Sequence, residues 1–224
     1  MKHWQDTYRN GFQSNNVKFP EQFVVKFFYG EAVLDFCSRK EARLLDIGAG
    51  FGRNVPLYKE FTSDITCIDP AAEAISKLKL IKGIRVEKFE PPEIDLGRTF
   101  DIIVACNSIY YLNPGENFEN YFQDVVKLLS RDGIFICSFI GEKHSILDGS
   151  KKCQHEVFKI DNKETKFIDR RGQLIFVPEA DHDFLKYGLD ILSSGTICDQ
   201  FDHSTRHLKV FCFRNNISTK EAHV

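Results

Sequence analysis

The sequence predicts an α/β protein with a doubly wound, mostly parallel sheet and helices on both faces, and three observations support this. Apolar runs typical of buried strands alternate five times with amphipathic segments between residues 43 and 141. A turn with three glycines, "DIGAGFG", directly follows the first apolar run. Beyond residue 141 the rhythm changes to short alternating stretches, which predict a small antiparallel insertion.

Each expected element follows from its local pattern. Phenylalanine and valine recur at helical spacing from 19 to 37, where Pro20 and Glu21 suit a helix start. Amphipathic stretches between the apolar runs predict the other helices of the core. The expected strands cover residues 43–47, 64–69, 83–89, 100–112 and 132–141. Residues 178–194 are expected to form a closing helix, followed by strands at 196–202 and 207–215.

The chain is expected to form a single domain over residues 1–224, because 42% of its residues are hydrophobic and can bury a sizeable core. The alternating stretches of the insertion occupy residues 154–178. The expected parts are an N-terminal helical cap at 1–40, a cofactor-binding core at 42–141, an inserted β-meander or lid at 142–178, and a closing helix and strands at 179–214.

Composition and charge narrow the range of partners. Lys and Arg number 30 against 32 Asp and Glu, without a long run of either sign, so neither nucleic acid nor a membrane is favoured. The N-terminus lacks the apolar core of a signal peptide, and a soluble, cytoplasmic protein is expected. Seven cysteines without a CxxC pair indicate reduced core residues. "HSTRH" falls in a predicted turn, so no metal site is expected.

The glycine turn indicates a close backbone approach to a ligand, because glycine adds no side-chain burial and costs the most backbone entropy. A dinucleotide-binding turn would need glycine at position 53, which is Arg53, and a phosphate-binding loop would need a GK[ST] ending. The remaining pattern is D-x-G-x-G-x-G, with Asp46 two residues before Gly48. Both nucleotide-binding alternatives are therefore disfavoured.

This pattern resembles the first motif of the class I S-adenosylmethionine-dependent methyltransferases. Further motifs are similar in the same order: Asp69 in "CIDP" after the second strand, "FDIIVACNSIYYL", and "LLSRDGIFICSF". The resemblance covers residues 20 to 140 and the closing elements. It implies a Rossmann-like seven-stranded sheet with an antiparallel last strand. It also implies S-adenosylmethionine as cofactor and S-adenosylhomocysteine as product.

The resemblance also assigns cofactor contacts to particular residues. Gly48 and Gly50 would lie against the methionine moiety, Asp46 would receive its ammonium group, and Asp69 would accept hydrogen bonds from both ribose hydroxyls. The aspartate that the family usually places near the adenine is absent here, and Glu90 or the backbone beside Phe89 takes its place. The other expected contacts are Ala49, Asn54, Pro70 and Asn107.

Acceptor and catalytic residues follow less directly, and each has a structural alternative. Tyr110 and Tyr111 are candidates for both acceptor binding and catalysis, or they pack under a lid. His144 is a possible general base or a solvated loop residue. Trp4 and Tyr8 resemble N-terminal aromatic segments that fold over the cofactor, and they would also suit a hydrophobic contact with the core.

Methyl transfer to a nitrogen or oxygen of a small-molecule acceptor is the expected function. The position of the insertion resembles that of sugar-amine N-methyltransferases, which favours nitrogen, and the insertion is also a possible homodimer contact. Three alternatives stay open: a tRNA or protein acceptor, a catalytically silent cofactor-binding subunit, and a nicotinamide-dependent oxidoreductase, which Arg53 disfavours.

Overall fold

The computed structural model describes residues 19–31, 33–34, 41–89, 94, 96–112, 118–161, 171–201 and 204–216. The helices are α2 (Gln22–Phe28), α4 (Val55–Phe61), α5 (Ala72–Leu78) and α6 (Phe118–Lys127), with 3-10 turns η2 (Ser145–Leu147) and η3 (Leu185–Tyr187). The strands are β1 (Arg43–Ile47), β2 (Asp64–Asp69), β3 (Arg85–Lys88), β4 (Phe100–Ala105), β5 (Tyr111–Leu112), β6 (Leu129–Ile140), β7 (Lys151–Gln154), β8 (Val157–Lys159), β9 (Leu174–Phe176), β10 (Leu189–Phe201) and β11 (Ser204–Asn215).

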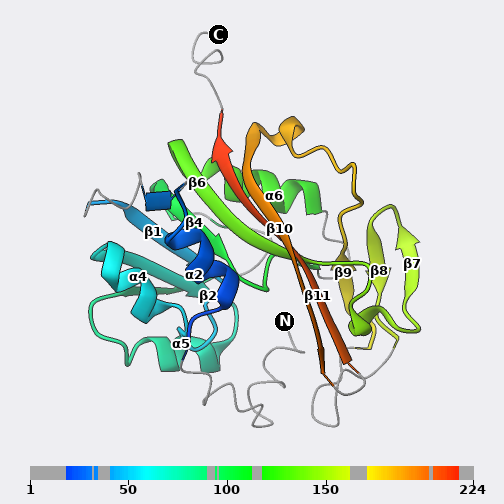
Figure 1. The fold of residues 1–224 in the computed structure, drawn as a ribbon. Coiled ribbons are helices and arrows are strands. Elements are labelled where there is room, and N and C mark those ends of the chain that lie inside the picture. The colour runs from blue at the N-terminus through cyan, green and yellow to red at the C-terminus, as the bar shows by residue number, and fades with distance from the viewer. Residues whose placement is uncertain are drawn as a thin grey trace.

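Seven strands form the main sheet, in the order β10-β11-β6-β4-β1-β2-β3 (Figure 1). β1 lies between β2 and β4 and is parallel to both, and β6 is parallel to β4. β11 is antiparallel to both of its neighbours. The expected seven-stranded sheet with an antiparallel last strand is confirmed. Because β1, β2 and β4 are parallel, their carboxyl ends meet at one edge.

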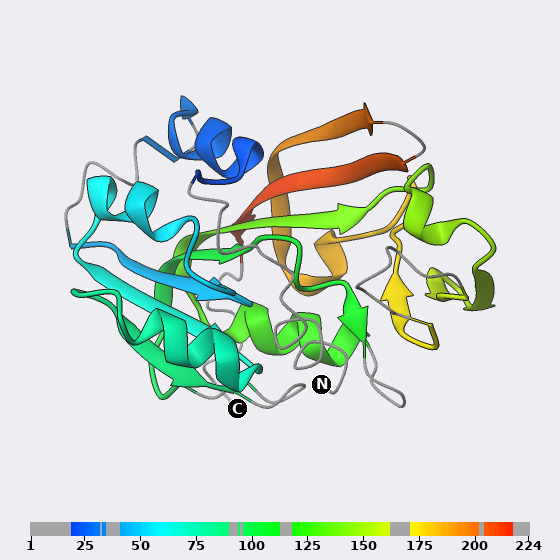
Figure 2. The same cartoon turned by 90° about the horizontal axis from the view of Figure 1, so that it is seen from below.

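Helices cover both faces of this sheet. On one face α2 packs on α4, with the rings of Phe28 and Tyr58 5.3 Å apart. On the other face α6 packs on the sheet, and Phe122 contacts the rings of Phe135 and Phe213. Figures 1 and 2 show α2 and α6 on opposite sides of the sheet. This arrangement requires apolar residues on both strand faces, as the continuous apolar runs predict.

A second, antiparallel sheet is made of four strands in the order β5-β9-β8-β7. The alternating stretches at 154–178 predict the inserted part of this sheet, although β7 begins earlier, at Lys151. The part expected at 164–169 lies outside the described residues. Tyr111 and Leu112 were expected to continue the fourth strand. They instead form β5 and pair with β9, because β4 ends at Ala105 and the chain turns at Asn107.

The predicted closing helix at 178–194 is wrong. Leu185–Tyr187 form a single 3-10 turn, and Gly188 in a left-handed conformation (φ 76°) ends it. From Leu189 the chain is a 13-residue strand paired with β11. The apolar spacing in this segment is compatible with a helix. Pairing along β11 overrides that local preference.

The ring of Phe176 should be the main apolar link between the two sheets. It stacks on Phe118 with 3.6 Å between ring centroids, and it also contacts Phe139 on β6. Truncation to alanine leaves a cavity, so F176A should lower the free energy of unfolding by about 3–5 kcal/mol in urea denaturation. Half-buried Phe158 in the same small sheet is the control, and F158A should cost about 1 kcal/mol or less. Equal losses in the two variants would contradict this role.

Candidate functional site

The glycine turn bends the chain sharply at the carboxyl end of β1. Gly48, Gly50 and Gly52 have φ angles of 71°, 57° and 78°, all in the left-handed region that side chains disfavour. The amide groups of Gly48 and Ala49 both donate to the carbonyl of Ile68, at 2.9 and 3.1 Å. These bonds fix the turn against the end of β2.

Gly48 is also required by a close approach to the neighbouring strand end. A Cβ atom at this position would lie 3.0 Å from Ser108 Oγ and nearer still to Ser108 Cβ. The Ser108 hydroxyl itself donates a 2.6 Å hydrogen bond to the carbonyl of Ile47. The ends of β1 and β4 are therefore joined by a contact that leaves no room for a side chain.

Asp46, near the carboxyl end of β1, is unusual because its carboxyl group is buried and has no hydrogen-bond partner among the described residues. The residue is 1% exposed, and no described residue forms a hydrogen bond with either oxygen. Burial raises the pKa of Asp46 to about 7; the nearby Tyr58 hydroxyl opposes this rise without reaching hydrogen-bond geometry, and the charge of Asp69 adds to it. A buried carboxylate without a hydrogen-bond partner is stabilised by a cation that binds beside it.

Asp69, at the end of β2, is the second buried acid of the edge and is well bonded. It is 3% exposed. Oδ2 accepts the amide of Gly50 and Oδ1 accepts the amide of Ala71, both at 2.9 Å. Burial raises the pKa of Asp69 to about 6, and the two amides oppose the rise. Asp69 thus holds the glycine turn, and each oxygen keeps a second lone pair for a ligand.

Asn107 lies where β4 ends, in a left-handed conformation with φ 55°. Its side-chain oxygen accepts a hydrogen bond from the Ser138 hydroxyl at 3.0 Å, and its backbone N–H donates to Ser138 Oγ at 2.9 Å. Asn54, another expected cofactor contact, is buried and accepts the backbone N–H of Glu21 at 2.9 Å. Both side chains therefore organise the edge in this structure.

Glu21, Arg53 and Arg206 form an ion-pair network that sequence reasoning missed. The buried carboxylate of Glu21 lies 2.9 Å from Arg53 and 2.7 Å from Arg206. Its Oε2 also lies 3.5 Å from Asn107 Nδ2. Arg53 follows the glycine motif directly, which was the available signal. Arg206 is 185 residues from Glu21, and no local pattern links the two.

The remaining predicted residues are distributed around the edge. Tyr110 is buried and its ring lies 4.4 Å from that of Tyr111, at the start of the second sheet. His144 follows β6, and its Nδ1 accepts the amide of Ile146 at 3.1 Å. Phe89 is buried directly after β3, and Pro70 follows Asp69. Trp4, Tyr8 and Glu90 lie outside the described residues.

Comparison with known proteins shows which family the glycine-turn region matches. Residues 45–135 match the profile of a family described as a methyltransferase domain. A solved S-adenosylmethionine-dependent methyltransferase from Anabaena variabilis superposes with a TM-score of 0.67 at 15% identity, over 96% of this chain and 94% of that one. Residues 45–135 therefore match a methyltransferase domain, and the chain has the fold of solved S-adenosylmethionine-dependent methyltransferases.

Two further proteins resemble this methyltransferase domain. The N-methyltransferase NodS from Bradyrhizobium japonicum, solved with S-adenosylhomocysteine, has a TM-score of 0.58 at 15% identity, over 92% of this chain and 98% of that one. A Staphylococcus carnosus protein described as an uncharacterized methyltransferase is 24% identical over 59% of this chain. The chain spans 62% of the length of that curated relative.

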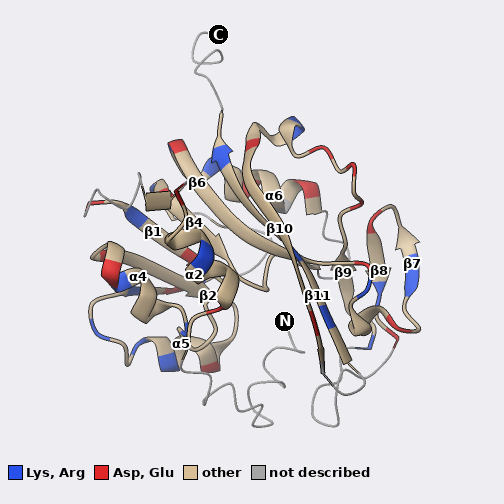
Figure 3. Ribbon diagram, in the orientation of Figure 1, with Lys and Arg blue, Asp and Glu red and all other residues tan. Residues whose placement is uncertain are grey.

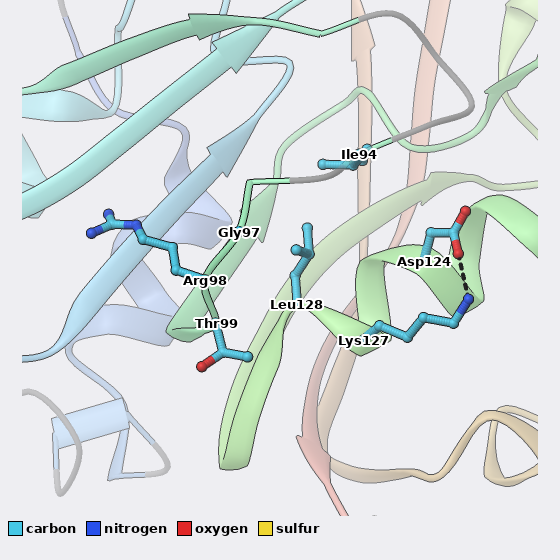
Figure 4. Close-up of a pocket in the computed structure, with 7 residues that line it drawn as sticks. All are labelled: Ile94, Gly97, Arg98, Thr99, Asp124, Lys127 and Leu128. Atoms are coloured by element: carbon cyan, nitrogen blue, oxygen red, sulfur yellow. Dashed lines mark hydrogen bonds and ion pairs between the residues drawn. The ribbon is translucent and has the colours of Figure 1, made fainter.

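The methyltransferase domain has a cavity of about 470 Å³ at the opposite edge of the sheet (Figure 4). It lies beside the start of β4 and the end of α6, away from the glycine turn. Lys127 is paired with Asp124 at 2.7 Å, and Arg98 extends out of the cavity to bind Asp64. Its lining residues are Ile94, Gly97, Arg98, Thr99, Asp124, Lys127 and Leu128.

Charge is mixed over the methyltransferase domain. Lys and Arg positions are interspersed with Asp and Glu positions over both sheets (Figure 3). Within the part of the chain that the structure describes, no helix is long and apolar enough to span a membrane.

Gly48 and Gly149 provide a matched test of the glycine turn. Both have φ 71°, but a Cβ at Gly149 would meet nothing within 4 Å, whereas one at Gly48 would collide with Ser108. G149A should cost about 1–2 kcal/mol of stability from backbone strain. G48A should cost about 1–3 kcal/mol more and lose S-adenosylhomocysteine binding, as measured by denaturation and calorimetry. Similar behaviour of the two variants would contradict the proposed close approach.

The raised pKa of Asp46 predicts a pH-dependent cost to stability. Its folded pKa, about 7, exceeds the unfolded value of 3.8, so the folded state binds more protons than the unfolded state between these values and loses stability as pH rises from about 4 to about 7. D46N lacks this titration, so its stability relative to the parent should rise by about 2 kcal/mol between pH 5.5 and 8. Urea denaturation at both pH values measures the difference. A pH-independent difference would contradict a raised pKa.

Proposed function

We propose that the chain is an enzyme that binds S-adenosylmethionine at the glycine turn and transfers its methyl group to a nitrogen atom of a small-molecule acceptor. The observation that carries this proposal is Asp46, a buried carboxyl group without a partner among the described residues. It lies beside a turn whose backbone only glycine adopts readily. A ligand with an ammonium group, presented along bare backbone, suits both features.

The residues of the edge fit the parts of the cofactor. Asp46 would receive the ammonium group of the methionine moiety. Asp69 would accept hydrogen bonds from the ribose hydroxyls with the lone pairs that the Gly50 and Ala71 amides leave unused. Phe89 and Pro70 would lie beside the adenosine. Asn107, where β4 ends, would lie near the methyl group.

The chemistry asks the protein mainly for position. When bound, the sulfonium of the cofactor supplies an electrophilic methyl group, which an acceptor attacks in line. The residues at the carboxyl edge therefore have to align the acceptor and exclude water. Tyr110 and Tyr111, whose backbones contact β9 of the second sheet, would contact the acceptor, and the second sheet would form its lid.

Two histidines near the carboxyl end of β6 favour a nitrogen acceptor. Nδ1 of His144 accepts the amide of Ile146, and Nδ1 of His207 accepts the amide of Lys143. A neutral imidazole bonded in this way carries its proton on Nε2 and acts there as a donor, which opposes the base role suggested for His144. A neutral amine attacks through its lone pair without prior loss of a proton, whereas a hydroxyl group needs a base. The N-methyltransferase NodS is a structural neighbour.

Calorimetric titration with S-adenosylhomocysteine tests the cofactor site. D69A should weaken binding at least tenfold, about 1.4 kcal/mol, because the ribose hydroxyls lose their acceptor and the turn loses its clamp. Asp101 is the control. It also accepts a hydrogen bond from a backbone amide, that of Arg43, but it lies at the start of β4, at the other end of the strand from the site. D101A should leave the affinity unchanged. Absence of binding by the parent protein would overturn the proposed function.

The acceptor is tested by turnover with paired amines and alcohols of the same carbon skeleton. Amines should be methylated at a rate that falls when the amine is protonated, and the matched alcohols should not react. Methylation of alcohols at comparable rates would contradict the nitrogen preference and require a base. Methylation of tRNA or protein alone would exclude the small-molecule acceptor.

A further inference from the structure

Arg53 directly follows the glycine turn, and its guanidinium group is only partly used in this structure. Nη2 lies 2.9 Å from Glu21 Oε2. Nε is buried, and no described residue accepts a hydrogen bond from it. A buried donor without an acceptor is unfavourable and is rare in folded proteins unless a ligand completes it.

Glu21 fixes the orientation of this guanidinium group. Its carboxylate is 5% exposed, and Arg206 holds its other oxygen at 2.7 Å. Its backbone N–H donates to Asn54, which follows Arg53 in the chain. The carboxylate is thus anchored from both sides. Arg53 therefore presents Nε in a preset direction, and little side-chain entropy remains to be lost when an acceptor binds.

Arg53 and Asp46 flank the glycine turn, and both lie near the end of β4. Asp46 pairs with Val104 on β4. The Glu21 carboxylate, 2.9 Å from Arg53, also lies 3.5 Å from Asn107 Nδ2, just beyond β4. Arg53 and Asp46 form no ion pair with each other that the structure records, and each keeps buried polar atoms without a partner among the described residues. A donor and an acceptor that both need a ligand thus flank one turn.

An α-amino acid group matches this pair, because it carries an ammonium and a carboxylate on the same carbon. A ligand that places its ammonium at Asp46 necessarily holds its carboxylate close by. We propose that Arg53 binds the carboxylate of the cofactor's methionine moiety through its Nε–H, as the counterpart of Asp46. This inference rests on the proposed function, which supplies the cofactor. It makes Arg53 a binding residue and Glu21 its positioning residue.

The test compares two ligands on three proteins by calorimetry. S-adenosylhomocysteine and its decarboxylated analogue, 5′-S-(3-aminopropyl)-5′-thioadenosine, differ only in the carboxylate. Arg206 is the matched control for Arg53, because the two side chains share the Glu21 carboxylate and are 35% and 34% exposed. The parent protein and R206M should prefer S-adenosylhomocysteine roughly ten- to one-hundred-fold, as expected for a charge-assisted bond. R53M should lose that preference with its affinity for the analogue unchanged.

Every other result would overturn the inference, and each would point to a different cause. An R53M variant that keeps the preference, or that loses affinity equally for both ligands, would assign Arg53 a structural role only. Loss of the preference in R206M as well would mean that the ligand carboxylate is recognised by the whole network of Glu21, Arg53 and Arg206 and not by Arg53 itself. Failure of the parent protein to bind either ligand would overturn the proposed function itself. Should R53M unfold, R53K tests the same point, because lysine keeps the charge and lacks the Nε donor; its preference should be intermediate.

Discussion

The buried carboxyl group of Asp46 is the constraint on which the site depends. An acid that is 1% exposed and has no hydrogen-bond partner among the described residues costs folding free energy, and the rise of its pKa to about 7 expresses that cost. The neighbouring backbone carries a second cost, since the glycine required at position 48 loses more backbone entropy on folding than other residues do. A ligand that brings a cation and uses the bare backbone offsets both costs. Stability and binding are therefore opposed at this turn.

The two faces of the main sheet make different contacts: one supports the polar residues of the site, and the other carries an aromatic cluster. Neighbouring residues on β6 show this difference, because side chains alternate between the two faces along a strand. Ser138 bonds Asn107 at the site, whereas Phe139 packs in the aromatic cluster beneath α6. On β11 the same alternation directs Arg206 to Glu21 and Phe211 to Phe139. The second sheet attaches through this aromatic face, where Phe176 contacts Phe118 and Phe139.

Local sequence patterns predicted the core of the fold and the position of the glycine turn, but not the contacts between residues far apart in the sequence. The apolar runs and the glycine motif predicted β1 and β2 and located Asp46 and Asp69 near their carboxyl ends, because each is encoded within a few residues. The predicted closing helix was wrong because twelve residues of β10 pair with β11, and this pairing outweighs a helical spacing. The link between Glu21 and Arg206 was beyond sequence reasoning, since only the folded sheet brings β11 beside the start of α2.

Proton exchange on cofactor binding tests the central claim most directly. Titration calorimetry with S-adenosylhomocysteine at pH 7, in buffers of different ionisation enthalpy, counts the protons released per ligand bound. If Asp46 has a pKa of about 7 and becomes fully ionised beside the ligand's ammonium group, binding should release about half a proton, and D46N should release far less. No proton exchange at pH 7, or equal release by the two proteins, would contradict an Asp46 carboxyl group that is half-protonated in the free protein and ionises when the cofactor binds.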